Sequence, residues 1–465
     1  MTPQEDEYLP RISVERVCVV EQGHGSKKEG VKVCKIDQNV RFSIEGLRSY
    51  CFANWDERIY DAFVLAAAVQ FCDHVKPRPK VAWGRVFEVT IPVHDPDLWN
   101  SPSVSRALHD ALTLLTGDHW SIEFINRKQP ADQPRQSSLN LPGGAVTLMP
   151  FSDGLDSRVV SGLIENSNSS RLMRVRLGSK RLGGKQNSKH EPFALVPYKV
   201  SYKPYGSRES SGRSRGFRFA LLSAVGAFMA DASEIVVSES GQGAIGPTLV
   251  TVGQGYDDYR NHPLFTIRME ALIKALFDHT VKYQFPRLWH TKGETLKSYL
   301  DTCGEKAPWR DTWSCWRSNQ FSSVDGAKRQ CGVCAACLLR RLSVHAAGQE
   351  EDRSTYVWED LSARSFEEGA AENFKLHHPR GAHFQYAIAG VLHLEHLAKF
   401  TNSPLNRSAL TRKNNQLSKA LNIHLDDITS KSNRMLQAHA NEWENFLTSL
   451  GNDSFIVKWL EGDQS

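Results

Sequence analysis

The 465-residue sequence lacks any apolar run approaching the roughly 18 to 20 residues that a membrane-spanning helix requires. Its first residues, Met1 to Glu15, are acidic and polar, and they lack the basic and apolar stretches of a secretory signal. Neither sign of charge dominates, because 57 Lys and Arg stand against 52 Asp and Glu. These absences exclude a membrane-spanning helix, favour a cytoplasmic location and argue against nucleic acid as a partner.

The chain is too long for one ordinary core, and its balanced composition predicts two or three globular domains. Residues 1–140 alternate short strand-like runs with one apolar helix at 56–72, which predicts an accessory α+β domain. Residues 351–465 show helical apolar spacing and predict a helical extension.

Residues 145–350 have a different pattern, with predicted strands at 145–150, 172–177 and 234–238 that alternate with predicted helices at 158–165 and 217–230. Alternation of this kind is typical of a parallel sheet with crossover helices. The fold class predicted for this part of the chain is therefore α/β.

Nine cysteines include four scattered ones and five crowded between Cys303 and Cys337. An odd count and this crowding favour a metal site over a disulfide framework. Two-residue spacings let thiolates converge on one tetrahedral ion, which predicts a closed structural zinc site formed by Cys315, Cys331, Cys334 and Cys337. An iron–sulfur cluster is the alternative, and Cys303 is expected to be a free thiol.

The run from Met149 to Ser157 reads as a strand, a glycine-containing turn and a helix start, but the chain has no Walker A motif. A helix that begins after such a turn presents backbone N–H groups to an anion. The predicted phosphate contacts are Ser152, Asp153, Gly154, Leu155, Asp156 and Ser157. An ordinary polar turn that caps a helix is the competing interpretation.

This turn resembles the S-G-G-x-D-S signature of the PP-loop ATP pyrophosphatases, with Asp153 in place of the usual glycine. Asp153 either repels phosphate or helps to hold Mg²⁺. Further motifs resemble the QueC (7-cyano-7-deazaguanine synthase) family: Thr291–Glu294, Asp311–Trp316, the cysteine run followed by Arg340, Ser214–Arg215, and Gly255–Arg260. The resemblance covers residues 145–352, and the flanking segments are additional to the family.

The resemblance implies a PP-loop domain that splits ATP into AMP and pyrophosphate while adenylating the carboxylate of a 7-carboxy-7-deazaguanine. ATP, Mg²⁺ and Zn²⁺ are the implied cofactors. The implied catalytic residues are Asp156, Ser157, Lys292 and Arg215, and the implied substrate contacts are Tyr256, Asp258, Arg260 and Trp313.

The sequence does not identify the amine that receives the activated carboxylate. Enlarged QueC-like proteins, the QatC type among them, occur in antiviral defence gene clusters, and we favour a protein acceptor such as the N-terminus of a partner from such a system. Synthesis of the nitrile from ammonia is the first alternative. A nucleotide-sensing scaffold without catalysis is the second, and Asp153 is the feature that favours it.

Overall fold

The computed structural model describes residues 13–22, 29–44, 47, 55–79, 82–130, 146–152, 154–167, 171–177, 196–253, 255–316, 322–374 and 381–462. The chain divides into two compact units, each made of three segments. The first unit comprises Met1–Leu148, Met173–Ile235 and Phe265–Lys282; the second comprises Met149–Leu172, Val236–Leu264 and Tyr283–Ser465. The predicted domain boundaries near 140 and 350 stay predictions.

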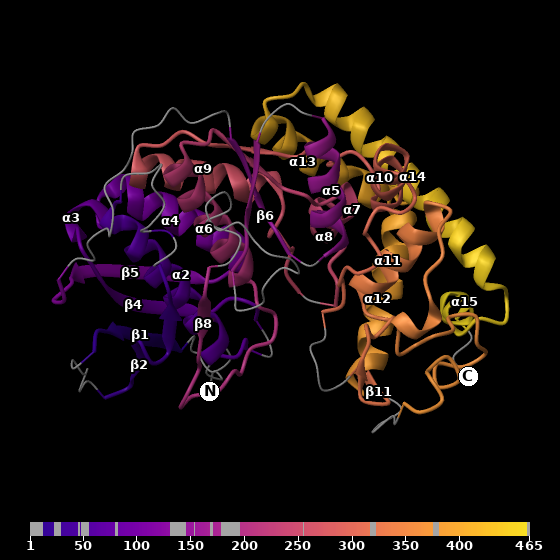
Figure 1. Cartoon of the computed structure of the whole chain (residues 1–465), viewed down its shortest axis with the longest axis horizontal. Coiled ribbons are helices and arrows are strands. Elements are labelled where there is room, and N and C mark those ends of the chain that lie inside the picture. The colour runs from indigo at the N-terminus through magenta and orange to yellow at the C-terminus, as the bar shows by residue number, and fades with distance from the viewer. Residues whose placement is uncertain are drawn as a thin grey trace, which may run out of the picture. The chain divides into compact units, whose positions relative to one another are not determined.

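The first unit contains a four-stranded sheet in the order β2-β1-β4-β5, whose strands are stacked in indigo and purple in Figure 1. Its strands are β1 (Val14–Val20), β2 (Val31–Lys35), β4 (Val86–Val93) and β5 (His119–Asn126). All three pairings are parallel. A second, antiparallel pair joins β3 (Val40–Phe42) to β8 (Tyr198–Val200).

The expectation of an α+β arrangement in residues 1–140 is wrong, because this sheet is parallel throughout. Parallel neighbours need crossover connections. Helices lie in two of them: α2 (Glu57–Val75) between β1 and β4, and α3 (Pro96–Trp99) with α4 (Pro102–Thr116) between β4 and β5. The α4 helix was not predicted. It starts with a proline at its first position and ends at Gly117, whose φ is +69°.

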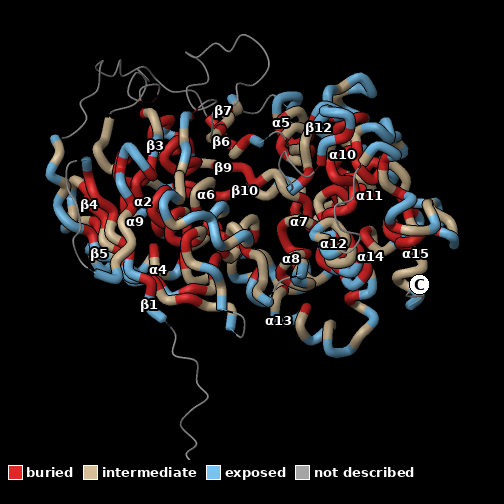
Figure 2. Tube along the Cα trace, turned by 90° about the horizontal axis from the view of Figure 1, so that it is seen from below, coloured by how far each residue is buried: buried red, intermediate tan, exposed pale blue. Residues whose placement is uncertain are grey.

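Helix α6 (Ser214–Ala230) contacts both α2 and α4, and α2 also contacts β4. The α2 helix is therefore enclosed on several sides, as Figure 2 shows, which explains its nearly continuous apolar run from Ala62 to Val69. The same unit holds most of α9 (Pro263–Phe277), where Phe277 packs against Phe228 of α6.

A buried ionic network stabilises the start of β4. The Arg85 guanidinium contacts Asp73 of α2 at 2.6 Å and Asp118 at 2.7 Å, and Arg78 contacts Asp118 at 2.9 Å. Asp73 also accepts the backbone N–H of Ser214 at 2.9 Å. The network thus ties the sheet, α2 and α6 together through charges that are almost fully removed from water.

The other four-stranded sheet has the order β10-β9-β6-β7, and the division between the two units falls within each of its strands. These strands are β6 (Val146–Pro150), β7 (Arg171–Val175), β9 (Glu234–Val236) and β10 (Lys282–Gln284). Because β6 and β9 are parallel, their carboxyl ends lie at the same edge. This pair confirms a parallel α/β arrangement at the predicted strands.

The second unit is mainly helical. Its helices are α5 (Leu155–Asn166), α7 (Gly241–Ala244), α8 (Gly246–Leu249), α10 (Lys292–Cys303), α11 (Ala335–Ala346), α12 (Ala382–Ala398), α13 (Pro404–Leu421), α14 (Leu425–Leu450) and α15 (Phe455–Glu461). A short hairpin joins β11 (Ser323–Val324) to β12 (Ala327–Lys328). Helices α12 to α15 agree with the predicted helical extension. No described helix is long and apolar enough to cross a membrane.

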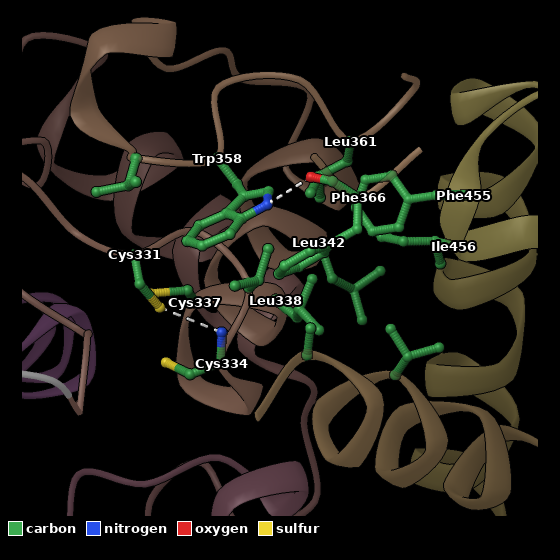
Figure 3. Close-up of a cluster of buried hydrophobic side chains, with 14 of the residues drawn as sticks. Cys331, Cys334, Cys337, Leu338, Leu342, Trp358, Leu361, Phe366, Phe455 and Ile456 are labelled. Atoms are coloured by element: carbon green, nitrogen blue, oxygen red, sulfur yellow. Dashed lines mark hydrogen bonds between the residues drawn. The ribbon is translucent and has the colours of Figure 1, made fainter. Parts of the chain in front are cut away.

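The largest apolar cluster of this unit surrounds Trp358, whose indole N–H donates to the carbonyl of Phe366 at 2.8 Å (Figure 3). Leu338 and Leu342 of α11 and Phe455 of α15 pack in the same cluster. The C-terminal helices therefore share one core with the cysteine-rich segment.

We expect Arg85→Met to lower the free energy of unfolding by about 3 to 5 kcal/mol, because buried Asp73 would lose its nearest cation and Asp118 would keep only Arg78. The matched control is Arg16→Met, which breaks the exposed Arg16–Glu88 pair of the same sheet and should cost less than about 1 kcal/mol. Urea unfolding of both variants measures the difference. Equal losses would show that the network contributes no more than a surface ion pair.

Candidate active site

The turn that follows β6, residues 152–157, is held by contacts among its own residues. Ser157 Oγ lies 2.8 Å from the carbonyl oxygen of Ser152 and 3.0 Å from that of Gly154. Ser152 Oγ accepts the backbone N–H of Gly154 at 3.1 Å, and Gly154 precedes α5 as its N-cap. The exposed Ser152 thus stands at the opening of a helix N-terminus, which is suited to an anion.

Helices α5 and α10 lie side by side and run in the same direction. Three pairs of residues contact each other in the same order along both helices: Asp156 with Lys292, Gly162 with Tyr299, and Asn166 with Cys303. A Cβ atom at Gly162 would lie 2.3 Å from the Tyr299 ring, so glycine is needed for this close approach. Two helix N-termini, each with a positive dipole end, consequently open at the same place.

An ion pair between Asp156 and Lys292 joins the first turns of these helices. Lys292 is only 7 % exposed and occupies the first position of α10, where the helix dipole disfavours a cation. The Asp156 carboxylate offsets this cost. A buried lysine at a helix N-terminus has a clear use if an anionic ligand binds there, since lysine is then a point charge directed at the ligand.

Glu239 lies just beyond the carboxyl end of β9, at the same sheet edge as the turn after β6. Its carboxylate packs against Gly243 of α7 so closely that a Cβ there would lie 2.1 Å from Oε2. Burial and the negative field of Asp156 raise the pKa of Glu239 to about 7, although Lys292 opposes this shift.

The segment Tyr256–Arg260 contributes the predicted substrate residues of this site. Within it, Arg260 Nε contacts both carboxylate oxygens of Asp258, at 3.0 and 2.9 Å. Both side chains act electrostatically on Glu239. The Tyr256 ring stands edge-on to Tyr259 at 6.3 Å. The structure thus brings the predicted phosphate residue Asp156 and two predicted substrate residues, Asp258 and Arg260, within the electrostatic range of the Glu239 carboxylate.

Several predicted residues have a narrower role than expected. Leu155 is 1 % exposed and its side chain packs in a core with Leu296 and Trp309, so only its backbone can reach a ligand. Ser157 is also buried, and its hydroxyl closes the turn. Arg215 belongs to the first unit, where its guanidinium lies over Phe219, and its catalytic role stays a prediction. Asp153 lies outside the described residues.

The sulfur atoms of Cys315, Cys331, Cys334 and Cys337 lie within 4.8 Å of one another, and all four residues are buried. A tetrahedral zinc ion with Zn–S bonds of about 2.3 Å separates its sulfurs by about 3.8 Å. The Cys331 and Cys337 sulfurs are 3.8 Å apart. The donor set and its spacing therefore fit zinc, as the sequence predicts.

Backbone N–H groups support the thiolates of this cluster. Cys331 N–H donates to Cys315 Sγ, and Cys334 N–H donates to Cys331 Sγ, each at 3.3 Å (Figure 3 draws the second). Gln330 Oε1 accepts the N–H groups of Ser314 and Cys315 at 2.8 and 3.2 Å. The two N–H···S contacts favour the charged form of sulfur, and the Gln330 contacts orient the chain at Cys315.

The cysteine cluster also fixes the chain that borders the turn after β6. A Cβ atom added to Gly154 would lie 3.7 Å from the carbonyl oxygen of Trp313. Trp313 in turn donates its indole N–H to the carbonyl of Cys315, a cluster residue, at 3.2 Å. Trp313, a predicted substrate contact, is thereby placed next to the predicted phosphate site.

Residues 239–348 match the family model described as Queuosine biosynthesis protein QueC. No curated protein matches the chain. The match supports the resemblance to QueC proteins, which use ATP, and it spans Glu239, the Tyr256–Arg260 segment, Lys292 and the four cysteines. The turn at 152–157 precedes the matched residues, so its assignment depends on its sequence pattern and on its contact with Lys292.

Sequence reasoning missed Glu239 and Gln242. The Gln242 side chain accepts the backbone N–H of Lys292 at 2.7 Å and is 1 % exposed. Both residues lie in the run Ser238-Glu-Ser-Gly-Gln-Gly directly after a predicted strand. Ligand sites of parallel sheets form at the carboxyl ends of strands, and this rule would have drawn attention to them.

We expect Cys334→Ser to reduce bound zinc from about one ion per chain to a small fraction, because three thiolates form a weaker site. Thermal unfolding should occur at least about 5 °C lower, since metal binding is coupled to folding. Elemental analysis and a melting curve measure both.

Cys303→Ser is the control, because Cys303 contacts Asn166 and lies outside the cluster; zinc content should be unchanged. Iron with visible absorbance in the purified wild type would contradict zinc and establish the iron–sulfur alternative.

Proposed function

We propose that this chain uses ATP to adenylate the carboxylate of a 7-carboxy-7-deazaguanine, releasing pyrophosphate, and then transfers the acyl group to an amine. The observation that supports this proposal most directly is that the N-termini of α5 and α10 lie next to each other, with Lys292 between them. The QueC match supports the use of ATP.

In this proposal the turn at 152–157 and Lys292 bind the nucleotide phosphates. The backbone N–H groups at the start of α5 and the exposed hydroxyl of Ser152 donate to phosphate oxygens. Lys292 offsets the charge that develops on the departing pyrophosphate. Mg²⁺, which takes oxygen ligands, would be held by phosphate oxygens together with the Asp156 carboxylate.

The deazaguanine carboxylate is proposed to lie between this turn and the Tyr256–Arg260 segment. Arg260 and Asp258 offer a cation and an acceptor for the polar edges of the base, and Trp313 offers an aromatic face for stacking. The carboxylate oxygen attacks the α-phosphorus, the bond to the bridging oxygen breaks, and pyrophosphate leaves. No proton moves in this step.

Glu239 is proposed to accept the proton of the attacking amine. The amine nitrogen forms a bond to the acyl carbon, the bond between that carbon and the AMP oxygen breaks, and one amine proton passes to the Glu239 carboxylate. A base with a pKa near the working pH is the most efficient for this transfer. The pKa of about 7 meets this requirement.

We propose a protein amine, the N-terminus of a partner, as the acceptor. The chain carries helices α12 to α15 beyond the segment that matches QueC, and Lys413 of α13 donates to Tyr259 Oη at 3.0 Å in the substrate segment. Helices additional to the family therefore contact the proposed site. Ammonia is the competing acceptor, and its product would be a free amide or nitrile rather than a modified protein.

The first test measures AMP formed from ATP and Mg²⁺ with and without carboxy-deazaguanine. We expect AMP only with the deazaguanine, and a decrease in kcat of about 10² to 10³ for Lys292→Ala, as for the loss of a charge at the transition state. Lys297→Ala, an exposed lysine of the same helix, should retain wild-type activity.

Mass spectrometry of the products identifies the acceptor. A folded, zinc-containing wild type that forms no AMP would contradict the proposed function and favour a nucleotide-sensing scaffold.

A second test concerns the proton acceptor. We expect the ratio of the wild-type to the Glu239→Gln acyl-transfer rate to be small at pH 5.5 and to rise through pH 7 to a plateau, because only the ionised carboxylate accepts a proton. Taking the ratio removes the titration of the amine itself.

Glu444→Gln, which changes an exposed glutamate on α14, serves as the control, and its rate ratio should stay near one across the pH range. A ratio for Glu239→Gln that stays constant with pH would rule out Glu239 as the base.

A further inference from the structure

Side chains of the C-terminal helix α14 converge on the first turn of α10, where Lys292 lies. Glu442 accepts the hydroxyl of Thr291, the residue that precedes Lys292. Arg434 donates to the carboxylate of Glu294 at 2.7 Å. A third α14 residue, His439, reaches the same turn through Gln242. Helix α14 lies outside the residues that match QueC.

The His439 contact has a defined direction. Burial lowers the pKa of His439 to about 4, so the ring is neutral near pH 7. Its Nε2 lies 2.9 Å from the carbonyl oxygen of Leu394 and must carry the ring proton there. Nδ1 therefore accepts the Gln242 amide N–H at 2.8 Å, which leaves Gln242 Oε1 to accept the backbone N–H of Lys292 at 2.7 Å.

The Glu442 contact completes the cap of α10. The Thr291 hydroxyl accepts the backbone N–H of Glu294 at 3.0 Å in a capping box and gives its own proton to Glu442. Both hydrogen-bonding roles of the hydroxyl are thereby used. The approach is close, since a Cβ atom at Gly293 would lie 2.7 Å from Glu442 Oε1.

We infer that Glu442 and His439 of α14 are positioning residues for Lys292, so that the C-terminal helices form part of the phosphate site. These contacts hold Thr291 through Glu442, the backbone N–H of Lys292 through Gln242, and the Glu294 side chain through Arg434. Asp156 holds the ammonium group of the same lysine. The role of Lys292 in this inference rests on the proposed function.

A mutation series on α14 tests the inference. Glu442→Ala removes the acceptor of the Thr291 proton. We expect kcat for AMP formation to fall about tenfold while KM for ATP changes less, because the turn at 152–157 still binds the phosphates and Lys292 also offsets the charge on the leaving group. Glu442→Gln keeps an acceptor oxygen and should remain within about threefold of the wild-type kcat. The matched control is Glu444→Ala, an exposed residue two positions away, which should be unchanged.

The double variant Lys292→Ala/Glu442→Ala separates positioning from a general structural role. If Glu442 acts through Lys292, the double variant should be no slower than Lys292→Ala alone, because the lysine that Glu442 positions is already absent. A double variant whose loss of kcat equals the product of the two single losses would overturn the inference.

Hydrogen exchange of the peptide spanning residues 291–296, measured without nucleotide, gives a readout that does not need activity. We expect the Lys292 amide, which donates to Gln242, to exchange at least about tenfold faster in Glu442→Ala than in Glu444→Ala. Equal exchange in the two variants would overturn the inference. The exchange test and the AMP test can fail separately. If the wild type forms no AMP but the Lys292 amide exchanges faster in Glu442→Ala, the positioning contacts are supported and only the proposed function is contradicted.

Discussion

The parallel packing of α5 on α10 is the constraint on which the rest of the site depends. It places two helix starts together, and this arrangement would be electrostatically unfavourable with a lysine at the first position of α10 if Asp156 did not face that lysine. Gly162 permits the close approach of the two helices. The turn after β6 and Glu239 after β9 then meet at one sheet edge because their strands are parallel.

Two parts of the chain that are distant in sequence hold the starts of α5 and α10 in place. The cysteine cluster fixes the chain at Trp313, which borders the turn at Gly154. Helix α14 fixes the first turn of α10 through Thr291 and Gln242. The cluster and the C-terminal helices share one apolar core (Figure 3), so both of these parts belong to the same packed region of the second unit.

Local patterns were sufficient to predict much of this arrangement. The cysteine spacing identified a cluster whose four sulfurs converge, and alternating strands and helices identified the parallel pair β6 and β9. The sequence did not reveal Glu239, Gln242 or α14 as parts of one site, because their contacts join residues up to about two hundred positions apart. It also misjudged the first unit, where the unrecognised helix α4 lies in the crossover between the parallel strands β4 and β5. Mg²⁺, the deazaguanine and a defence partner stay predictions.

The central claim is that the paired starts of α5 and α10 bind the phosphates of ATP. A crystal structure of the chain with Mg²⁺ and a non-hydrolysable ATP analogue tests it most directly. The account predicts phosphate oxygens within hydrogen-bonding distance of Lys292 Nζ and of the backbone N–H groups after Gly154. A nucleotide bound elsewhere, or one whose phosphates point away from both helix starts, would contradict it.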